Sequence, residues 1–173
     1  MKEKTQKERL EDMMKRPIPR KRVGIIHLNM IKEDRWLYGM RKMNSAEKAV
    51  EMIKPLLKYS DREMILVVSV NARLEPMAIE IVAVGGIESC HVDVRNLFKH
   101  ALLNQASSVM CFHNHPSGNE TPSRDDRKVT KRISEAGRLL GVSLLDHIII
   151  GDNGYYSFRE NGELTDDIPY ETA

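Results

Sequence analysis

The chain alternates between two hydrophobic periods, which predict strands and helices in turn. Residues 64–70, MILVVSV, form a near-continuous apolar run that is typical of a strand covered on both faces. The segment MAIEIVAVGG at 77–86 follows a polar turn, and we expect it to pair antiparallel with 64–70. Further apolar or β-branched runs predict strands at 23–31, 35–41, 108–112, 142–151 and 155–158.

Between these runs, apolar residues recur at helical spacing. The pattern predicts helices over 45–59, 94–105 and 123–140, and Gly141 is expected to end the last of them. Pro55 lies late in the first helix, where it is expected to kink or shorten it. Strands that alternate with helices of this length indicate an α/β fold, with a mixed β-sheet flanked by helices.

Composition is that of a soluble globular protein. Of the 173 residues, 41% are hydrophobic and 30% are charged, and the net charge is +2. We expect one domain over 23–162, with a basic arm at 1–22 before it and an acidic tail at 163–173 after it. The segment RPIPRKR at 16–22 makes nucleic-acid phosphates or lipid headgroups candidate partners of the arm, and a solvated leader is the simpler alternative.

Cysteine usage and hydropathy bear on the cellular compartment. Cys90 and Cys111 form no CxxC pair, which fits a reducing environment better than a disulfide framework. The charged N-terminal residues lack the apolar centre of a secretory signal, and no apolar run approaches the roughly 20 residues needed to span a bilayer. We therefore expect a cytoplasmic protein with no membrane partner.

Candidate chemistry is concentrated in HNHPSGNETPSRDD, residues 113–126. His113 and His115 follow a predicted strand, and side chains two apart on extended backbone point the same way. The loop then returns a carboxylate at a predicted helix start, from Asp126 or, as the alternative, Asp125. Two imidazoles and one carboxylate predict a catalytic zinc site, because a fourth position stays open for water, whose pKa zinc lowers toward ~7.

This segment also has interpretations other than a metal site. Ser123 and Asp126 also form an S-x-x-D capping pattern, which begins helices without any metal. Neither the zinc deaminase pattern nor HExxH is present, and the HNH nuclease residues are spread along a ββα unit rather than adjacent. The residues themselves leave the general base open, since the loop offers only Glu120.

The same segment fits the JAMM pattern of His-x-His, seven residues, Ser, two residues and Asp. It resembles the RadC-like branch of the JAB/MPN+ family, and the similarity extends over roughly 25–162. The segments that carry it are KAVEMIKPLL, DREMILVVSVNARLEP, LFKHALLNQASSVMCFHNHPSG and LLDHIIIGDNGYYSFRENG. One departure is Val92-Asp93-Val94-Arg95-Asn96, where this branch usually has V-H-P-R-E.

The resemblance implies a JAB/MPN-like, cytidine-deaminase-like three-layer sandwich. It implies one zinc ion per chain, held by His113, His115 and Asp126, and a JAMM metallopeptidase that cleaves a peptide or isopeptide bond in a peptide or protein substrate. By position, Glu63 is the implied general base, and Ser123 matches the serine that polarises the scissile carbonyl. From composition alone, Glu75 or Glu80 would serve as well as Glu63.

His147, in LLDHIIIG, fits the family but is predicted to be a hydrogen-bonded core histidine rather than a ligand.

The alternatives to a peptidase are a non-enzymatic DNA-associated module that uses RPIPRKR, and a metal-dependent nuclease built on the same metal site. The DNA-repair association of this branch follows from its name and not from these residues.

Overall fold

A computed structural model describes residues 5, 7–8, 11–12, 15, 42–57, 60–85 and 92–165. The chain divides into two compact units, 1–33 and 34–173, and the second contains all the candidate site residues. The basic segment at 16–22, the predicted strands at 23–31 and 35–41, Cys90 and the residues after 165 lie outside the described residues.

The second unit is built on a five-stranded mixed sheet with the order β2-β1-β3-β4-β5. Strand β1 (Met64–Val70) pairs antiparallel with β2 (Pro76–Val84) on one side and with β3 (Ser108–Asn114) on the other. Strand β4 (Ser143–Ile150) runs parallel to β3, and β5 (Tyr155–Ser157) pairs antiparallel with β4. The predicted mixed sheet, and the antiparallel pairing of its first two described strands, are confirmed.

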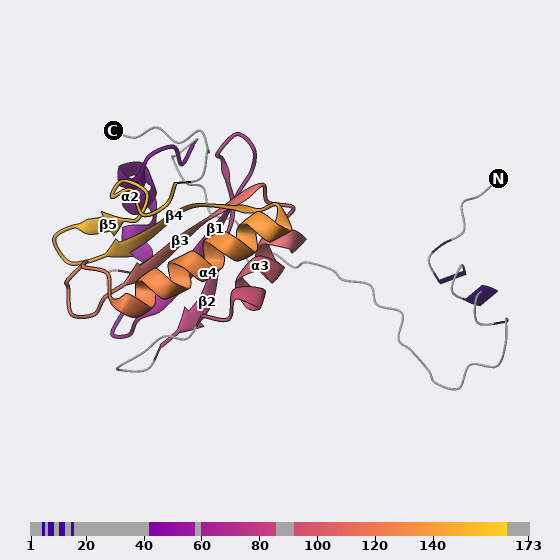
Figure 1. Ribbon diagram of the computed structural model, residues 1–173, viewed down its shortest axis with the longest axis horizontal. Helices are drawn as coiled ribbons and strands as arrows, with labels where there is room; N and C mark the ends of the chain where they lie inside the picture. The colour runs from indigo at the N-terminus through magenta and orange to yellow at the C-terminus, as the bar shows by residue number, and fades with distance from the viewer. Residues whose placement is uncertain are drawn as a thin grey trace. The chain divides into compact units, whose positions relative to one another are not determined.

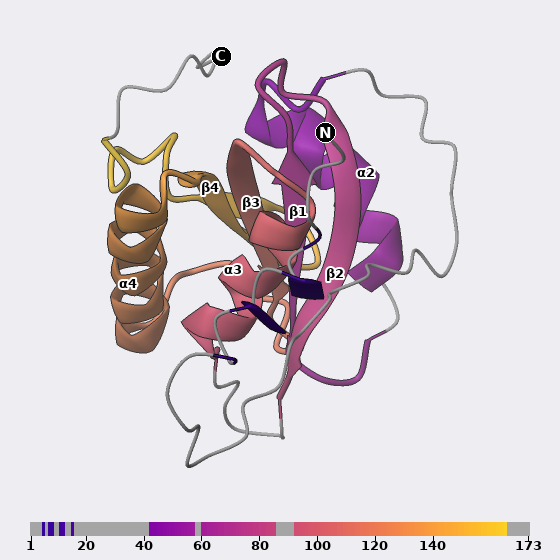
Figure 2. The ribbon, with the colours of Figure 1, turned by 90° about the vertical axis from the view of Figure 1, so that its right-hand side faces the viewer.

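Helices cover both faces of this sheet, as Figures 1 and 2 show. Helix α2 (Ala46–Leu57) packs on one face against inward side chains of β1, β3 and β4. Helices α3 (Val94–Leu103) and α4 (Arg124–Leu140) pack on the other face around Phe98 and Ile133. The result is three layers, helix, sheet and helices, with two hydrophobic cores.

The β3-α4-β4 unit brings the candidate residues together. Parallel strands need a crossover connection, and here α4 supplies it. Ser123 caps the start of α4, and Gly141 ends it in the left-handed conformation, with φ at 70°. The predicted strand at 108–112 continues two residues further, because His113 pairs with both Ile65 of β1 and Ile149 of β4.

Asp93 accounts for one departure from the family pattern. It is the N-cap of α3, and its carboxylate accepts a hydrogen bond of 3.0 Å from the backbone N–H of Arg95. Aspartate is among the residues that most favour this position, since it satisfies a backbone donor that the helix leaves unpaired. The substitution therefore has a local structural role as the cap of α3.

The start of the predicted acidic tail packs on α4. The Glu163 carboxylate accepts hydrogen bonds from Arg127 and from the Tyr156 hydroxyl, and the Leu164 side chain is buried. Cys111 lies in β3 as a buried free thiol. Within the part of the chain that the structure describes, no helix combines the length and apolar character needed to cross a membrane.

Candidate metal centre

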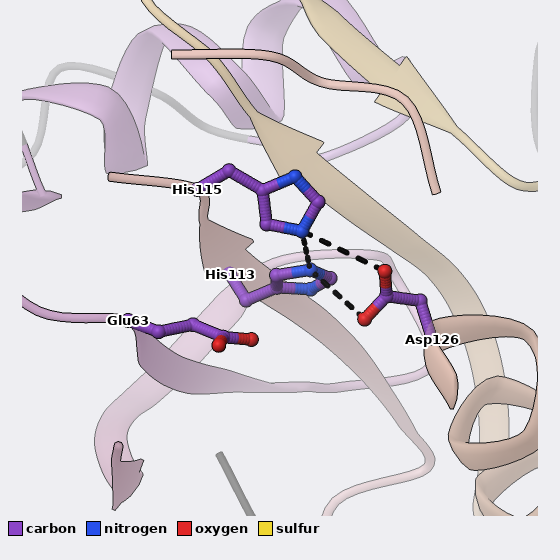
Figure 3. A group of neighbouring side chains, drawn as sticks. All are labelled: Glu63, His113, His115 and Asp126. Carbon is purple, nitrogen blue, oxygen red and sulfur yellow. Dashed lines mark hydrogen bonds and ion pairs between the residues drawn. The ribbon is translucent and has the colours of Figure 1, made fainter. Parts of the chain in front are cut away.

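Four side chains converge where β3 gives way to the loop before α4 (Figure 3). Glu63, His113, His115 and Asp126 each offer one ligand atom, and these four atoms all lie within 4.8 Å of one another. They come from the residue before β1, from β3, from the loop after it and from the first turn of α4. The structure thus brings together four of the five residues that the sequence analysis proposed for metal binding and catalysis.

The two histidines face the same side, as their spacing predicted. Their Nε2 atoms are 3.0 Å apart, and their rings are tilted by 56°. The Nδ1–H of His115 donates a hydrogen bond of 2.6 Å to the backbone oxygen of Asn119. Since that oxygen can only accept, this contact leaves Nε2 as the nitrogen with a lone pair toward the centre when the His115 ring is neutral.

Asp126 serves as both a helix cap and a member of the group. Its Oδ2 accepts a hydrogen bond of 2.6 Å from the backbone N–H of Ser123, and the Ser123 hydroxyl oxygen accepts from the N–H of Asp126 at 3.1 Å. This capping box leaves Oδ1 of Asp126 directed at His113, 3.4 Å from its Nε2. Asp125, the alternative ligand, is exposed and pairs with Lys128 at 2.8 Å.

Ser123, the fifth proposed residue, is exposed at the start of α4. Its oxygen accepts from Asp126, so its hydroxyl hydrogen can donate to another group. The capping interpretation and the metal interpretation therefore describe the same geometry rather than competing ones. Holding the carboxylate in a capping box also fixes the direction in which it faces the imidazoles.

Glu63 stands at the entry to β1, and its carboxylate points toward the centre from the side opposite Asp126 (Figure 3). No hydrogen bond to its carboxylate is found among the described residues, which leaves it free to exchange a proton. The two alternatives that composition offered are engaged elsewhere. Glu75 accepts a hydrogen bond from Asn71, and Glu80 lies 3.6 Å from His100.

Asn114, between the two histidines, is a residue that the sequence analysis missed. Its side chain faces the other way from theirs and spans the backbone around Glu63. The amide oxygen accepts from the N–H of Met64 at 2.8 Å, and the amide nitrogen donates to the carbonyl of Arg62 at 2.9 Å. The only sequence signal for this role is the position of an amide between two histidines that face the same side. The sequence does not identify its partners, because they lie about 50 residues earlier in the chain.

The donor set and its spacing fit a small divalent cation. Ligand atoms held about 2.0–2.1 Å from a tetrahedral zinc ion lie about 3.3–3.4 Å from one another. Three separations among the imidazole nitrogens and carboxylate oxygens are 3.0, 3.4 and 3.6 Å. Two bare imidazole nitrogens at 3.0 Å repel each other unless a cation or a proton lies between them, so the geometry favours a positive ion there.

Comparison with known proteins places this geometry in a family. A family model described as RadC-like JAB domain matches residues 43–163, which include all four side chains of the group. The chain belongs to the RadC-like JAB domain family.

Relatives of this RadC-like JAB domain occur in several bacteria. A UPF0758 protein of Listeria monocytogenes is 44% identical over 116 residues, which cover 67% of this chain and 52% of that protein. UPF0758 proteins of Desulfitobacterium hafniense and Thermotoga maritima are each 39% identical, over 70% and 71% of this chain and 54% and 55% of their own length. The chain thus spans about half the length of the curated relatives it matches.

Burial and charge shift the pKa values within this JAB domain. Burial lowers the pKa of His113 well below its usual value, and the neighbouring His147 lowers it further. A hydrogen bond to Asp126 raises the pKa of His115. Burial works to raise the pKa of Asp126, but hydrogen bonds from His115 and Ser123 outweigh it and hold that pKa well below its usual value. Burial, together with the charge of Asp126, raises the pKa of Glu63.

His147 lies just behind the group. It is 1% exposed, its Nε2 is 2.8 Å from Nδ1 of His113, and its ring stacks on Phe158. Burial lowers the pKa of His147 to about 4, so the ring is neutral near neutral pH. The prediction of a hydrogen-bonded core histidine agrees with these contacts, and its partner is a member of the candidate metal centre.

Proposed function

We propose that this chain is a zinc-dependent hydrolase of the JAMM type, which cleaves a peptide or isopeptide bond in a peptide or protein substrate. The observation that carries the proposal is the arrangement of two carboxylates around one imidazole pair. Asp126 completes a set of three metal ligands, while Glu63 faces the same centre with no other described hydrogen-bond partner. A structural metal site would have no need of the second, unengaged carboxylate.

Zinc is the proposed metal because the ligand types suit it. Two imidazole nitrogens and one carboxylate oxygen are typical of catalytic zinc sites, whereas magnesium and calcium prefer oxygen ligands alone. When bound, zinc lowers the pKa of water toward neutrality and polarises a carbonyl group. His113, His115 and Asp126 would hold it, and the low pKa of Asp126 keeps that ligand ionised at neutral pH.

Glu63 is proposed to move the proton. A general base and acid works best when its pKa lies near the working pH, and burial and Asp126 shift the pKa of Glu63 in that direction. The Asn114 side chain hydrogen-bonds to the backbone on both sides of Glu63. These bonds fix the backbone position from which the Glu63 side chain extends toward the centre. Glu63 would accept a proton from the attacking water and return it to the leaving amine.

Ser123 is proposed to assist at the carbonyl oxygen. Its hydroxyl oxygen already accepts from the backbone of α4, so the hydroxyl hydrogen is available to a substrate oxygen. A fixed donor aimed at a developing oxyanion strengthens as negative charge grows there. The amide specificity itself rests on the family resemblance, since these side chains define metal-assisted hydrolysis in general.

The test combines metal analysis with cleavage assays on the full chain. We expect about one zinc per chain in the purified protein and none in a variant that combines His113→Ala with His115→Ala. Zinc-loaded protein should cleave members of a peptide library, and Glu63→Gln should abolish cleavage while it retains zinc. Glu75→Gln is the matched control, because it makes the same chemical change outside the centre.

The same assays distinguish the other functions. Cleavage of plasmid DNA but not of peptides, lost in Glu63→Gln, would replace the peptidase with a nuclease. Binding to DNA that weakens steeply with salt, with no cleavage of either substrate, would replace it with a DNA-associated module. Absence of zinc from the parent protein, even after incubation with excess zinc, would refute the metal site.

A further inference from the structure

A buried chain of hydrogen bonds links two members of the metal centre through the protein interior. The Thr130 hydroxyl donates to the backbone oxygen of Asp126 at 2.6 Å and lies 2.6 Å from Nδ1 of His147. Nε2 of His147 in turn lies 2.8 Å from Nδ1 of His113. Thr130, His147 and His113 are 3%, 1% and 0% exposed, so bulk water does not compete for these contacts.

The direction of each hydrogen bond follows from counting protons. A carbonyl oxygen can only accept, so the single hydroxyl hydrogen of Thr130 goes to Asp126. The oxygen of Thr130 must then accept from His147, which places the proton of that ring on Nδ1. A neutral imidazole has one N–H, so Nε2 of His147 is bare, and it can accept only if Nδ1 of His113 carries the proton.

We propose that Thr130 and His147 are positioning residues that fix the tautomer of His113, so that its Nε2 lone pair faces the metal centre. The opposite tautomer would put a hydrogen on the nitrogen that must bind the cation. The part of this inference that concerns zinc rests on the proposed function. The assignment of the tautomers rests on the hydrogen-bond geometry alone.

Helix α4 contributes to the placement of two proposed ligands, Asp126 directly and His113 through Thr130 and His147. Asp126 and Thr130 lie one turn apart on α4, so the element that presents the carboxylate also presents the hydroxyl that orients the imidazole. The Phe158 ring stacks on that of His147, with the ring centroids 5.2 Å apart and the planes inclined by 10°. Packing thus holds the His147 ring in the plane that the two hydrogen bonds require.

The first experiment compares Thr130→Val with Thr130→Ser in the full chain. Valine keeps the shape of threonine and removes the hydroxyl, whereas serine keeps the hydroxyl. Nitrogen-15 NMR of the imidazoles in metal-free protein reports which nitrogen carries the proton. We expect Nδ1–H tautomers at His113 and His147 in the parent and in Thr130→Ser, and a mixture of tautomers at His113 in Thr130→Val.

Zinc affinity, measured by competition with a chromophoric chelator, is the second readout. We expect Thr130→Val to bind zinc about 10- to 100-fold more weakly than the parent, as is usual when a hydrogen bond behind a ligand is lost. Thr130→Ser should stay close to the parent. A weaker affinity with an unchanged tautomer at His113 would overturn the proposal, because Thr130 would then act through packing alone.

A second pair of variants keeps the test valid if Thr130→Val fails to fold. His147→Gln retains an acceptor for His113 and a donor for Thr130, whereas His147→Phe keeps only a ring that can stack on Phe158. We expect His147→Gln to preserve the tautomer of His113 and His147→Phe to lose it. An Nε2–H tautomer at His147 in the parent would overturn the proposal directly.

The two readouts also separate this inference from the proposed function. If the parent binds no zinc, the zinc-dependent hydrolase fails, but the tautomers of metal-free protein still test the hydrogen-bond chain. If the parent and Thr130→Val bind zinc equally and have the same tautomer at His113, the hydrogen bonds through Thr130 and His147 have no positioning role. The metal centre itself would then stand.

Discussion

Asn114→Ala is the change that most directly tests how Glu63 is held. The Asn114 side chain is 6% exposed and makes two hydrogen bonds to the backbone on either side of Glu63, at 2.8 Å to Met64 and 2.9 Å to Arg62. Alanine removes both bonds and leaves the histidine side chains on the opposite side of the strand unaltered. The structure therefore predicts separate effects on stability, cleavage and metal binding.

The magnitude follows from the two bonds. A hydrogen bond within a protein contributes about 1 kcal/mol net to stability, so the loss of two should cost about 2 kcal/mol. For a chain of this length, that corresponds to a fall in Tm of about 4–8 °C. A displacement of the Glu63 carboxylate by about 1 Å would lower the rate of cleavage by about 100-fold. Zinc affinity should stay close to that of the parent.

Urea denaturation at equilibrium measures the first effect, cleavage of a peptide the second and chelator competition the third. Asn161→Ala is the matched control, because it makes the same change at an exposed residue with one side-chain hydrogen bond, to the carbonyl of Ser157. Its cost should lie within about 0.5 kcal/mol. If Asn114→Ala costs no more than this control, or loses stability with full activity, Asn114 does not position Glu63.

Three further predictions concern stability. The folded-state pKa of Glu63 is raised above its usual 4.5, so Glu63 favours the fold below pH 4.5, and this contribution is lost as pH rises through the folded pKa. Glu63→Gln should therefore stabilise the metal-free protein at neutral pH but not below pH 4.5. Equal urea midpoints for parent and variant at neutral pH would contradict this. Ser123→Ala should cost about 1 kcal/mol in urea denaturation through loss of the helix cap, whereas Ser123→Thr should cost less. Gly137→Ala should cost about 1–3 kcal/mol, because a Cβ there would crowd the carbonyl of Val142 and the ring of Phe98; a Tm unchanged from the parent would show that the backbone adjusts freely.

The hydrophobic pattern determined the strands and helices of the described domain to within a few residues. Apolar runs and helical spacing are local properties, and each predicted element in the described ranges has its counterpart in the structure. The predicted helix at 94–105 extends two residues beyond α3, since polar residues at helix ends carry little periodic signal. Residues 58–59 of the predicted helix at 45–59 lie outside the described residues. The residues 113–126 could also be identified locally, because two histidines, a turn and a capping serine lie within one short segment.

Tertiary structure decided everything that depends on pairing between distant strands. In the sequence, only the family resemblance favours Glu63 over Glu75 and Glu80. In the structure, the pairing of β1 with β3 places Glu63 where its carboxylate faces the imidazoles. His147 read correctly as a core histidine, but its contact with His113 requires the parallel pairing of β3 and β4.

Asn114 and Thr130 show most clearly why the sequence alone does not reveal such roles. Each has an ordinary sequence context, one on a strand and one on a helix, and each acts through partners that the fold brings near. Asn114 reaches backbone about 50 residues earlier, and Thr130 reaches His147 17 residues later. Sequence alone determined which side chains are available as ligands, because ligand chemistry belongs to residue type. Their orientation and protonation are set by hydrogen bonds between strands and helices, which only the folded chain defines.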